Sequence, residues 1–356
     1  MTKKTESSAK QFPTGAAMLR KPFVISTGAT RRNLRTTGSL AGFLQPSQRV
    51  ASPQQDGGSA SGGKNAPRDD KIKSLLDWGR RELANLGTDE AQASAERLLE
   101  AIVEHERTAL YLNAEECVSK TQAANFCRLI LKRKARVPVA YLLQKAHFWE
   151  EVLEVRPGCL IPRPETEILI DSWIVHSGFR KDSFFSFLDL GAGTGAIGIA
   201  LLRHFPNAQG TFSDISEIAL SVTRRNLKKY ELLGRAEIVC SDLFEQLHPA
   251  RPWDAIVSNP PYVATKDLTN LEPELKFEPA IALDGGKDGL LFYRQIIRQA
   301  QHFLAPNGWL VLEMGAGQSP EIAPLISQHG YTQKKICKDY LGIERVIMAR
   351  VALKAD

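Results

Sequence analysis

Four consecutive residues, Asn259-Pro260-Pro261-Tyr262, have the composition to hold a planar amino or amide group. An amide nitrogen is a weak nucleophile because its lone pair is delocalised, so an enzyme that alkylates it must orient the group. The Asn259 side-chain oxygen and the Pro260 carbonyl can accept its two N–H groups, while the prolines restrict the backbone and Tyr262 offers a stacking face. Chance produces this run in about one chain per thousand of this length. We therefore interpret it as a catalytic and substrate-binding motif.

A glycine-rich run precedes this motif, and it follows the apolar stretch from Phe187 to Leu190. The run consists of Gly191, Ala192, Gly193, Thr194 and Gly195. Its place predicts a tight turn between a strand and a helix, where the backbone can approach a bound cofactor closely. The run also satisfies the loose dinucleotide pattern G-x-G-x-x-[GA], so by itself it does not distinguish NAD from S-adenosylmethionine.

Two later positions extend the expected cofactor site. Asp214 ends the next expected strand, where a carboxylate can accept hydrogen bonds from both ribose hydroxyls. Asp242 and Leu243 follow a third strand, and they suit the exocyclic amine and the ring of an adenine. We expect no metal, because methyl transfer from a sulfonium depends mainly on positioning and the five cysteines include no CxxC pair.

The elements that must position these residues follow from periodicity. From Phe185 onward strands and helices alternate, which predicts an α/β fold with a doubly wound parallel sheet, and residues 344–351 form a final strand. Residues 71–138 show helical spacing of apolar positions and predict a small helical domain. Residues 139–170 predict an interdomain hairpin and linker, and residues 171–356 the catalytic domain.

The positive charge of the chain is concentrated at its start. Residues 1–55 carry nine Lys and Arg but one acid, whereas the remainder carries 37 basic and 39 acidic residues. The net charge of +6 is therefore no evidence for nucleic-acid binding by the body. We expect residues 1–70 to be a disordered basic tail and linker, and the stretch from Leu19 to Leu44 to be a transit peptide, a disordered extension or a misassigned start.

The chain resembles the HemK-type protein-(glutamine-N5) methyltransferases, which modify the Gly-Gly-Gln motif of class I peptide chain release factors. The resemblance runs from about Lys71 to Arg350. Its motifs are LIPRPETE (160–167), LDLGAGTGAIGIAL (188–201), Asp214, NPPYV (259–263), EPAIAL-DGGKDGL-YR (278–294) and LEMGAGQ (312–318). Two features depart from the family: Gln144 stands where a glycine is usual after AYLL, and the basic tail is atypical.

This resemblance implies a Rossmann-like, class I methyltransferase mixed sheet that binds S-adenosyl-L-methionine. The glycine run, Asp214, Leu243 and Asn259 should line the cofactor site, and residues 259–262 should hold the glutamine. A release factor is then the protein partner. We expect no nucleic acid or membrane partner, a monomer, and a cytoplasmic location of bacterial type, or an organelle matrix if the tail is a transit peptide.

Three other functions share part of this pattern. Amino-methyltransferases that act on DNA adenine or RNA guanine also use NPPY, but they need a basic stripe or target-recognition domain that is not evident here. Glutamine methyltransferases of ribosomal proteins depart from the LIPRPETE pattern. An NAD-dependent dehydrogenase would explain the glycine run and leave NPPY without a role.

Overall fold

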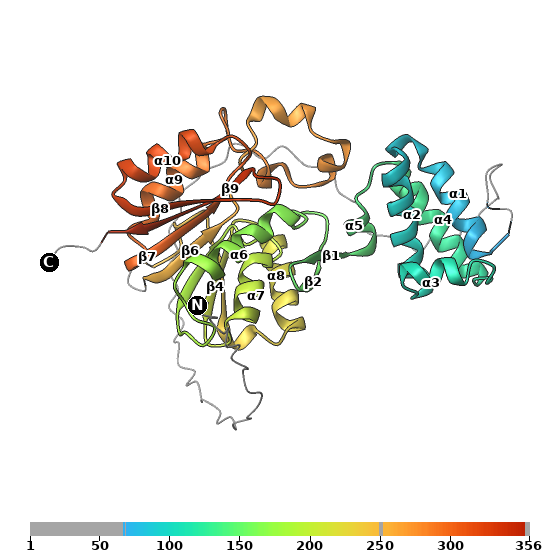
Figure 1. Ribbon diagram of the computed structural model, residues 1–356, viewed down its shortest axis with the longest axis horizontal. Coiled ribbons are helices and arrows are strands. Elements are labelled where there is room, and N and C mark those ends of the chain that lie inside the picture. Colours follow the sequence, from blue (N-terminus) through green and yellow to red (C-terminus); the bar gives the residue numbers. More distant parts are fainter. Residues whose placement is uncertain (1–66, 68, 249–251, 353–356) are drawn as a thin grey trace, which may run out of the picture. The chain divides into compact units, whose positions relative to one another are not determined.

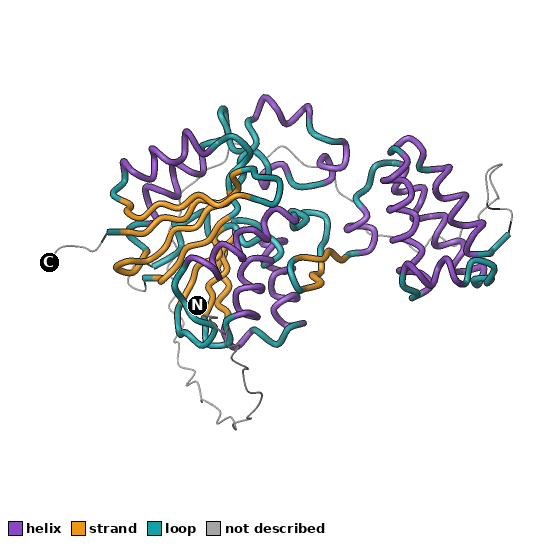
Figure 2. Tube along the Cα trace, viewed as in Figure 1, coloured by secondary structure: helices purple, strands orange, loops and turns teal. Residues whose placement is uncertain are grey.

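The computed structural model describes residues 67, 69–248 and 252–352 (Figure 1). The expected tail, up to residue 66, and the possible transit peptide lie outside these residues. From Ile72 to Leu143 the described chain is helical (Figure 2). The helices are α1 (Ile72–Glu82), η1 (Ala84–Leu86), α2 (Thr88–Val103), α3 (Arg107–Leu112), α4 (Lys120–Lys134) and α5 (Val139–Leu143).

Helices α1, α2 and α4 bury one apolar stripe each. In α1, Leu75 and Leu76 are buried at the spacing that the sequence showed, and they share a core with Leu98 of α2 and Phe126 of α4. Helix α4 begins at a capping box, in which the Ser119 hydroxyl accepts from the Gln122 amide and the Gln122 side chain accepts from the Ser119 amide.

A short hairpin follows the helices. Strands β1 (Lys145–Phe148) and β2 (Glu151–Glu154) pair antiparallel, with Phe148 and Leu153 buried. Gln144 ends α5 in the left-handed conformation, with φ 54°, and its carbonyl accepts from the Val155 amide. Glycine adopts this conformation without the steric cost that a Cβ imposes. The departure from the family at Gln144 is therefore a helix C-cap held in a conformation that favours glycine.

The remaining chain forms a seven-stranded sheet within the described residues, in the order β5-β4-β3-β6-β7-β9-β8. The strands are β3 (Ser186–Leu190), β4 (Gln209–Asp214), β5 (Ala236–Cys240), β6 (Trp253–Ser258), β7 (Leu304–Glu313), β8 (Tyr331–Lys338) and β9 (Glu344–Val351). The first five strands of that order run parallel, whereas β9 pairs antiparallel with both β7 and β8. The prediction of a Rossmann-like mixed sheet is confirmed.

Helices cover both faces of this sheet (Figure 1). One core joins Trp173, Phe187 and Phe212 beneath α6, α7 and α8, and the other joins Leu188, Tyr293 and Leu310 beneath α9 and α10. The helices are α6 (Glu167–His176), α7 (Ala196–His204), α8 (Glu217–Lys229), α9 (Leu291–Ala300) and α10 (Ser319–Gln328). The order of strands along the sheet reverses between the parallel strands β3 and β6, so their carboxyl ends form the crevice in which open α/β folds bind ligands.

Some elements carried no clear sequence signal. Strand β8 lies at the sheet edge, and most of its side chains are exposed, so it lacks an apolar alternation. Between β6 and α9 the chain forms short 3-10 turns, namely η4 (Thr265–Asn270), η5 (Pro273–Phe277) and η6 (Ala280–Ala282). Two more lie outside that stretch, η2 (Pro164–Thr166) before α6 and η3 (Leu233–Arg235) before β5.

The cap at Gln144 gives a stability prediction. Gln144→Gly should raise the free energy of unfolding by about 0.5–1 kcal/mol, because it removes a strained Cβ from an exposed position. Gln144→Ala keeps a Cβ and should bring no comparable gain. Urea unfolding followed by circular dichroism measures both, and equal effects of the two substitutions would contradict this explanation.

Candidate active site

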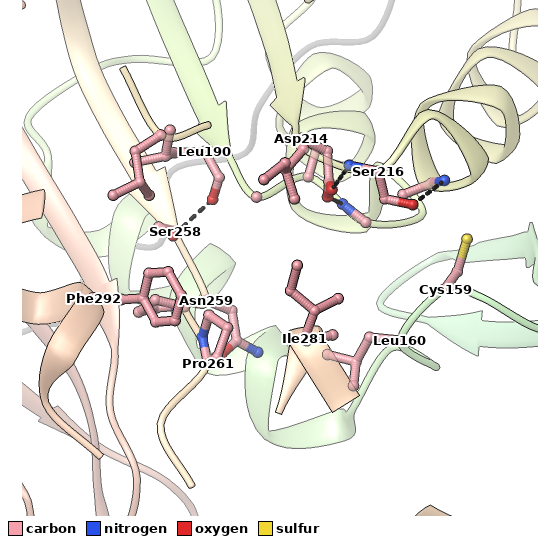
Figure 3. Close-up of a pocket in the computed structure, with 18 of the residues that line it drawn as sticks. Cys159, Leu160, Leu190, Asp214, Ser216, Ser258, Asn259, Pro261, Ile281 and Phe292 are labelled. Carbon is pink, nitrogen blue, oxygen red and sulfur yellow. Dashed lines mark hydrogen bonds between the residues drawn. The ribbon is translucent and has the colours of Figure 1, made fainter. Parts of the chain in front are cut away.

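A cavity of about 450 Å³ opens at the carboxyl ends of β3, β4, β5 and β6. It brings together most of the residues that the sequence singled out: Gly191, Ala192, Gly193, Thr194, Asp214, Asp242, Leu243, Asn259, Pro260 and Pro261. Apolar side chains including Leu160, Ile281 and Phe292 complete its wall (Figure 3). Its size and largely apolar lining with few polar groups suit a nucleoside-sized ligand.

The glycine run forms the floor of this cavity. Gly191, Gly193 and Gly195 all have positive φ, at 73°, 58° and 80°. A Cβ on Gly191 or Gly193 would meet no atom within 4 Å, so both face open space that a ligand can fill. Gly195 does not line the cavity, because its backbone faces α8 and an added Cβ would lie 3.0 Å from Thr223. Gly195 therefore shapes the turn and packs α7 against α8.

Asp214 links this floor to the cavity wall. Its Oδ2 accepts from the Gly193 amide and its Oδ1 from the Ser216 amide, both at 2.8 Å (Figure 3). Each carboxylate oxygen retains a lone pair for a further donor such as a ribose hydroxyl. Burial raises the pKa of Asp214, and the backbone hydrogen bonds oppose that rise. A diol at this position would add hydrogen bonds that favour the ionised form.

The segment after β5 carries Asp242 and Leu243, the two residues for which the sequence suggested an adenine-binding role. Asp242 is exposed, with its amide bonded to Gln246, and its carboxylate makes no hydrogen bond with the described chain. Leu243 has φ 45°, and its carbonyl accepts from the Ser241 hydroxyl. Both residues line the cavity, so an acceptor and an apolar face stand side by side where the sequence predicted them.

The NPPY motif begins where β6 ends. Ser258, the last residue of β6, donates to the Leu190 carbonyl at 2.7 Å and so ties the motif to the end of β3 (Figure 3). The Asn259 Nδ2 donates to the Thr166 hydroxyl at 3.0 Å. Its Oδ1 makes no hydrogen bond within the described chain. Asn259 and Pro260 line the cavity, whereas Tyr262 is half-buried and packs against the core beneath α9.

Two glycine motifs fix the backbone of NPPY. The Gly285 amide donates to the Val263 carbonyl at 2.7 Å, and an added Cβ on Gly285 would lie 2.8 Å from the Pro261 carbonyl. Gln318 donates from Nε2 to the Tyr262 carbonyl at 3.1 Å and accepts from the Gly315 amide at 2.9 Å. The segments DGGKDGL and LEMGAGQ therefore support the motif from behind.

The LIPRPETE segment contributes residues to which sequence reasoning gave no role. Glu278 accepts from the Ile161 amide at 2.9 Å and pairs with Arg163 at 2.5 Å, which holds the segment against the EPAIAL motif. Thr166 then reaches Asn259. The signal was present in the sequence, since both motifs were recognised as family features, but 115 residues separate Arg163 from Glu278. Only the folded chain shows that they meet.

One buried acid lies directly behind the glycine run. Asp189 is 1% exposed, and its Oδ2 accepts from the Gly198 amide at 2.9 Å, while its Oδ1 has no partner in the described chain. Burial raises the pKa of Asp189 to about 7, the Gly198 hydrogen bond opposes this rise, and the charge of Asp214 adds to it. The carboxyl group therefore changes charge near neutral pH.

Within the described residues, no group of three or more His, Cys, Asp or Glu side chains is arranged to hold a metal ion. No helix in that part of the chain is long and apolar enough to cross a membrane.

The sheet order, the glycine turn and the acid after β4 together define a class I S-adenosylmethionine-dependent methyltransferase. The pattern of the Methyltransferase small domain family matches residues 168–275, and that of the PrmC N-terminal domain matches residues 74–143. The chain is 36% identical to the release factor glutamine methyltransferase of Geobacter sulfurreducens, over 79% of this chain and 96% of that protein. It therefore belongs to the release factor glutamine methyltransferase family, as the sequence motifs predicted.

Other relatives support the same family assignment. The release factor glutamine methyltransferase of Caulobacter vibrioides is 35% identical over 75% of this chain and 91% of its own length. A bifunctional methyltransferase of Rickettsia felis is 33% identical over 78% of this chain, which covers 57% of that longer protein.

The close packing behind NPPY gives a testable prediction. Gly289 has φ 76°, and a Cβ there would lie 2.4 Å from the Tyr262 carbonyl oxygen, so Gly289→Ala must displace the motif. We expect turnover to fall at least about tenfold, since small misplacements of positioning groups are costly. Gly234→Ala is the control, because its Cβ would meet nothing within 4 Å. Equal turnover of the two variants would contradict the packing role.

Asp189 gives a prediction about stability and pH. Its raised pKa means that the folded state favours the protonated form, so its contribution to stability is present below about pH 4 and is lost as pH rises towards 7. Asp189→Asn cannot titrate, and its free energy of unfolding should fall less steeply over this range. Denaturant titrations at pH 5, 6, 7 and 8 compare the two slopes. Identical slopes would show that Asp189 does not titrate as described.

Proposed function

We propose that this chain transfers a methyl group from S-adenosyl-L-methionine to the side-chain amide nitrogen of the glutamine in the Gly-Gly-Gln motif of a class I peptide chain release factor. The observation that carries this proposal is the orientation of Asn259. Its amide nitrogen is engaged by Thr166, and its oxygen is left as an acceptor on a residue that lines the cavity. An acceptor at this place suits a substrate that presents an N–H group.

The chemistry requires positioning more than activation. S-adenosylmethionine supplies a methyl group that is already a strong electrophile. The chain must hold the glutamine nitrogen with its lone pair towards that methyl group, and the Asn259 Oδ1 and Pro260 carbonyl are the two acceptors proposed for its N–H groups. As the new N–C bond forms, the methyl–sulfur bond of the sulfonium breaks and leaves a neutral thioether, and the nitrogen loses one proton to water or a nearby acceptor.

The cofactor residues fit the same proposal. Gly191 and Gly193 leave space where a Cβ would otherwise stand, Asp214 keeps a free lone pair on each oxygen, and Leu243 offers an apolar face. We propose that Gly191 to Thr194, Asp214, Asp242, Leu243 and Asn259 hold the cofactor. Gly195 would act indirectly, through the shape of the turn, and Tyr262 through the backbone it shares with the motif.

The activity is tested by incubating the full chain with methyl-labelled S-adenosylmethionine and candidate release factors, and then locating the label by mass spectrometry. The proposal predicts one methyl group on the glutamine of Gly-Gly-Gln and none on a variant release factor with Gly-Gly-Ala. A ribosomal protein and a DNA or RNA duplex serve as competing substrates. Methylation of either of these, with none on a release factor, would overturn the assignment.

Two site variants should separate chemistry from cofactor binding. Asn259→Ala removes one acceptor and should lower turnover on the order of 10²–10³-fold, as expected for one well-placed transition-state hydrogen bond. Asp214→Ala should mainly raise the dissociation constant of the cofactor, by about 10–100-fold. Single-turnover kinetics and calorimetry measure the two effects. The assigned roles fail if Asn259→Ala retains near-normal turnover with its fold intact.

We also propose that the chain acts as a monomer, in the cytoplasm of a bacterial-type cell or in an organelle matrix. Light scattering of the purified protein tests the first statement, and fluorescence microscopy of full-length and 1–70-deleted fusions tests the second.

A further inference from the structure

Three segments that are far apart in the sequence meet behind Asn259. Thr166 is the last residue of η2, in the LIPRPETE segment, and is 4% exposed. Glu313 is the last residue of β7, in the LEMGAGQ segment, and is 1% exposed. Strand β7 pairs with β6 so that Leu312 lies opposite Ser258, which places Glu313 and Asn259 at the same edge of neighbouring strands.

Thr166 contacts both of the other residues. Its Oγ1 accepts a hydrogen bond from the Asn259 Nδ2 at 3.0 Å. The buried Glu313 carboxyl group is near enough for the Thr166 hydroxyl to lower its pKa, against the rise that burial causes. The Glu313 Oε2 has no hydrogen-bond partner in the described chain, so a nearly fully buried acid keeps an acceptor that a nearby hydroxyl could fill.

The number of protons sets the direction of these hydrogen bonds. A threonine hydroxyl has one proton and two lone pairs, and an ionised carboxylate can only accept. The Thr166 hydroxyl can give its proton to the unpartnered Glu313 carboxylate while one of its lone pairs accepts from Asn259. A lone pair can be matched by the Asn259 NH₂ group and not by its oxygen. The amide oxygen is consequently turned away from Thr166.

We propose that Thr166 and Glu313 form a positioning relay that fixes which face of the Asn259 carboxamide is presented to the substrate amide. The proposal rests on the function proposed above and deepens it. Without the relay, the Asn259 amide can rotate by half a turn. Its NH₂ group, a donor, would then face the NH₂ group of the glutamine, which is also a donor. Such a site retains the glycine run and Asp214 for the cofactor but repels the substrate nitrogen from the reactive position.

The charge state of Glu313 belongs to the relay. Burial raises the pKa of Glu313 to about 7; Thr166, Arg345 and Arg163 oppose the rise, and Glu165 adds to it. The ionisable Tyr262 and Tyr293 also lie near it. Above this pKa the carboxylate accepts from Thr166, whereas below it the acid can donate and release the Thr166 proton towards Asn259. Turnover in the wild type should therefore fall as pH drops through about 7.

Thr166→Val and Thr166→Ser test the relay directly. Valine keeps the shape and removes the hydroxyl, so kcat should fall about 10–100-fold with less than about threefold change in cofactor dissociation constant. Serine restores the hydroxyl and should return kcat to within about threefold of wild type. Thr211→Val is the matched control, because Thr211 is also buried and loses a hydrogen bond, from Trp253, but lies outside the cavity. Its kcat should be unchanged.

A double variant distinguishes positioning from general structural support. If Thr166 acts through Asn259, then Thr166→Val should add little to the loss caused by Asn259→Ala, whereas independent effects would multiply. Multiplied losses, normal kcat in folded Thr166→Val, or failure of serine to rescue would overturn the relay. Wild-type methylation of a release factor is measured first, so a failed relay is distinguishable from a failed function.

Glu313→Gln provides a second route if the threonine variants do not fold. Glutamine can donate to Thr166 at every pH, so kcat should be lowered and should lose its dependence on pH between about 6 and 8. Retention of wild-type kcat together with the wild-type acid limb would overturn the role of Glu313.

Discussion

The placement of the NPPY motif depends on one constraint. The backbone around Gly285 and Gly289 packs closely against the backbone of residues 259–263. Strand β6 brings the motif to the sheet edge and ends at Ser258, so residues 259–263 lie beyond the strand, and Val263 makes an isolated bridge with Asp284. Its carbonyls are instead held by the Gly285 amide and the Gln318 side chain, at distances that no Cβ on Gly285 or Gly289 would allow. The position of Asn259 follows from this packing.

The glycines in the proposed cofactor half of the cavity have a different role from Gly285 and Gly289. There Gly191 and Gly193 face open space, and the turn they form donates its amides to the Ser213 carbonyl and the Asp214 carboxylate of the neighbouring strand. Burial of Asp189 and Asp214 below the turn raises both pKa values, which favours a ligand that brings hydrogen-bond donors or positive charge. The same cavity therefore combines the acidic, glycine-lined wall at Asp214 with the Asn259 side chain, the two features on which the proposed cofactor and substrate sites rest.

The sequence predicted those parts of the fold that are governed by local pattern. Alternating strands and helices indicated the sheet, and the glycine run, Asp214 and NPPY each lie at a strand end, where such folds bind ligands. Strand β8 was not predicted, because an exposed edge strand has no apolar alternation. The contacts of Thr166 with Asn259 and of Arg163 with Glu278 were also not predictable, because 93 and 115 residues separate the partners. The motifs identified these segments as family features, but only the tertiary structure shows which of their atoms are in contact.

In the proposed reaction, the Asn259 Oδ1 accepts a hydrogen bond from the side-chain amide of the substrate glutamine. A crystal structure of the full chain with S-adenosylhomocysteine and a Gly-Gly-Gln release factor tests this most directly. We expect the glutamine nitrogen within about 3 Å of both the Asn259 Oδ1 and the Pro260 carbonyl, with the Asn259 Nδ2 still bonded to Thr166. A glutamine that lies outside hydrogen-bonding distance of Asn259, or one that meets its Nδ2, would contradict it.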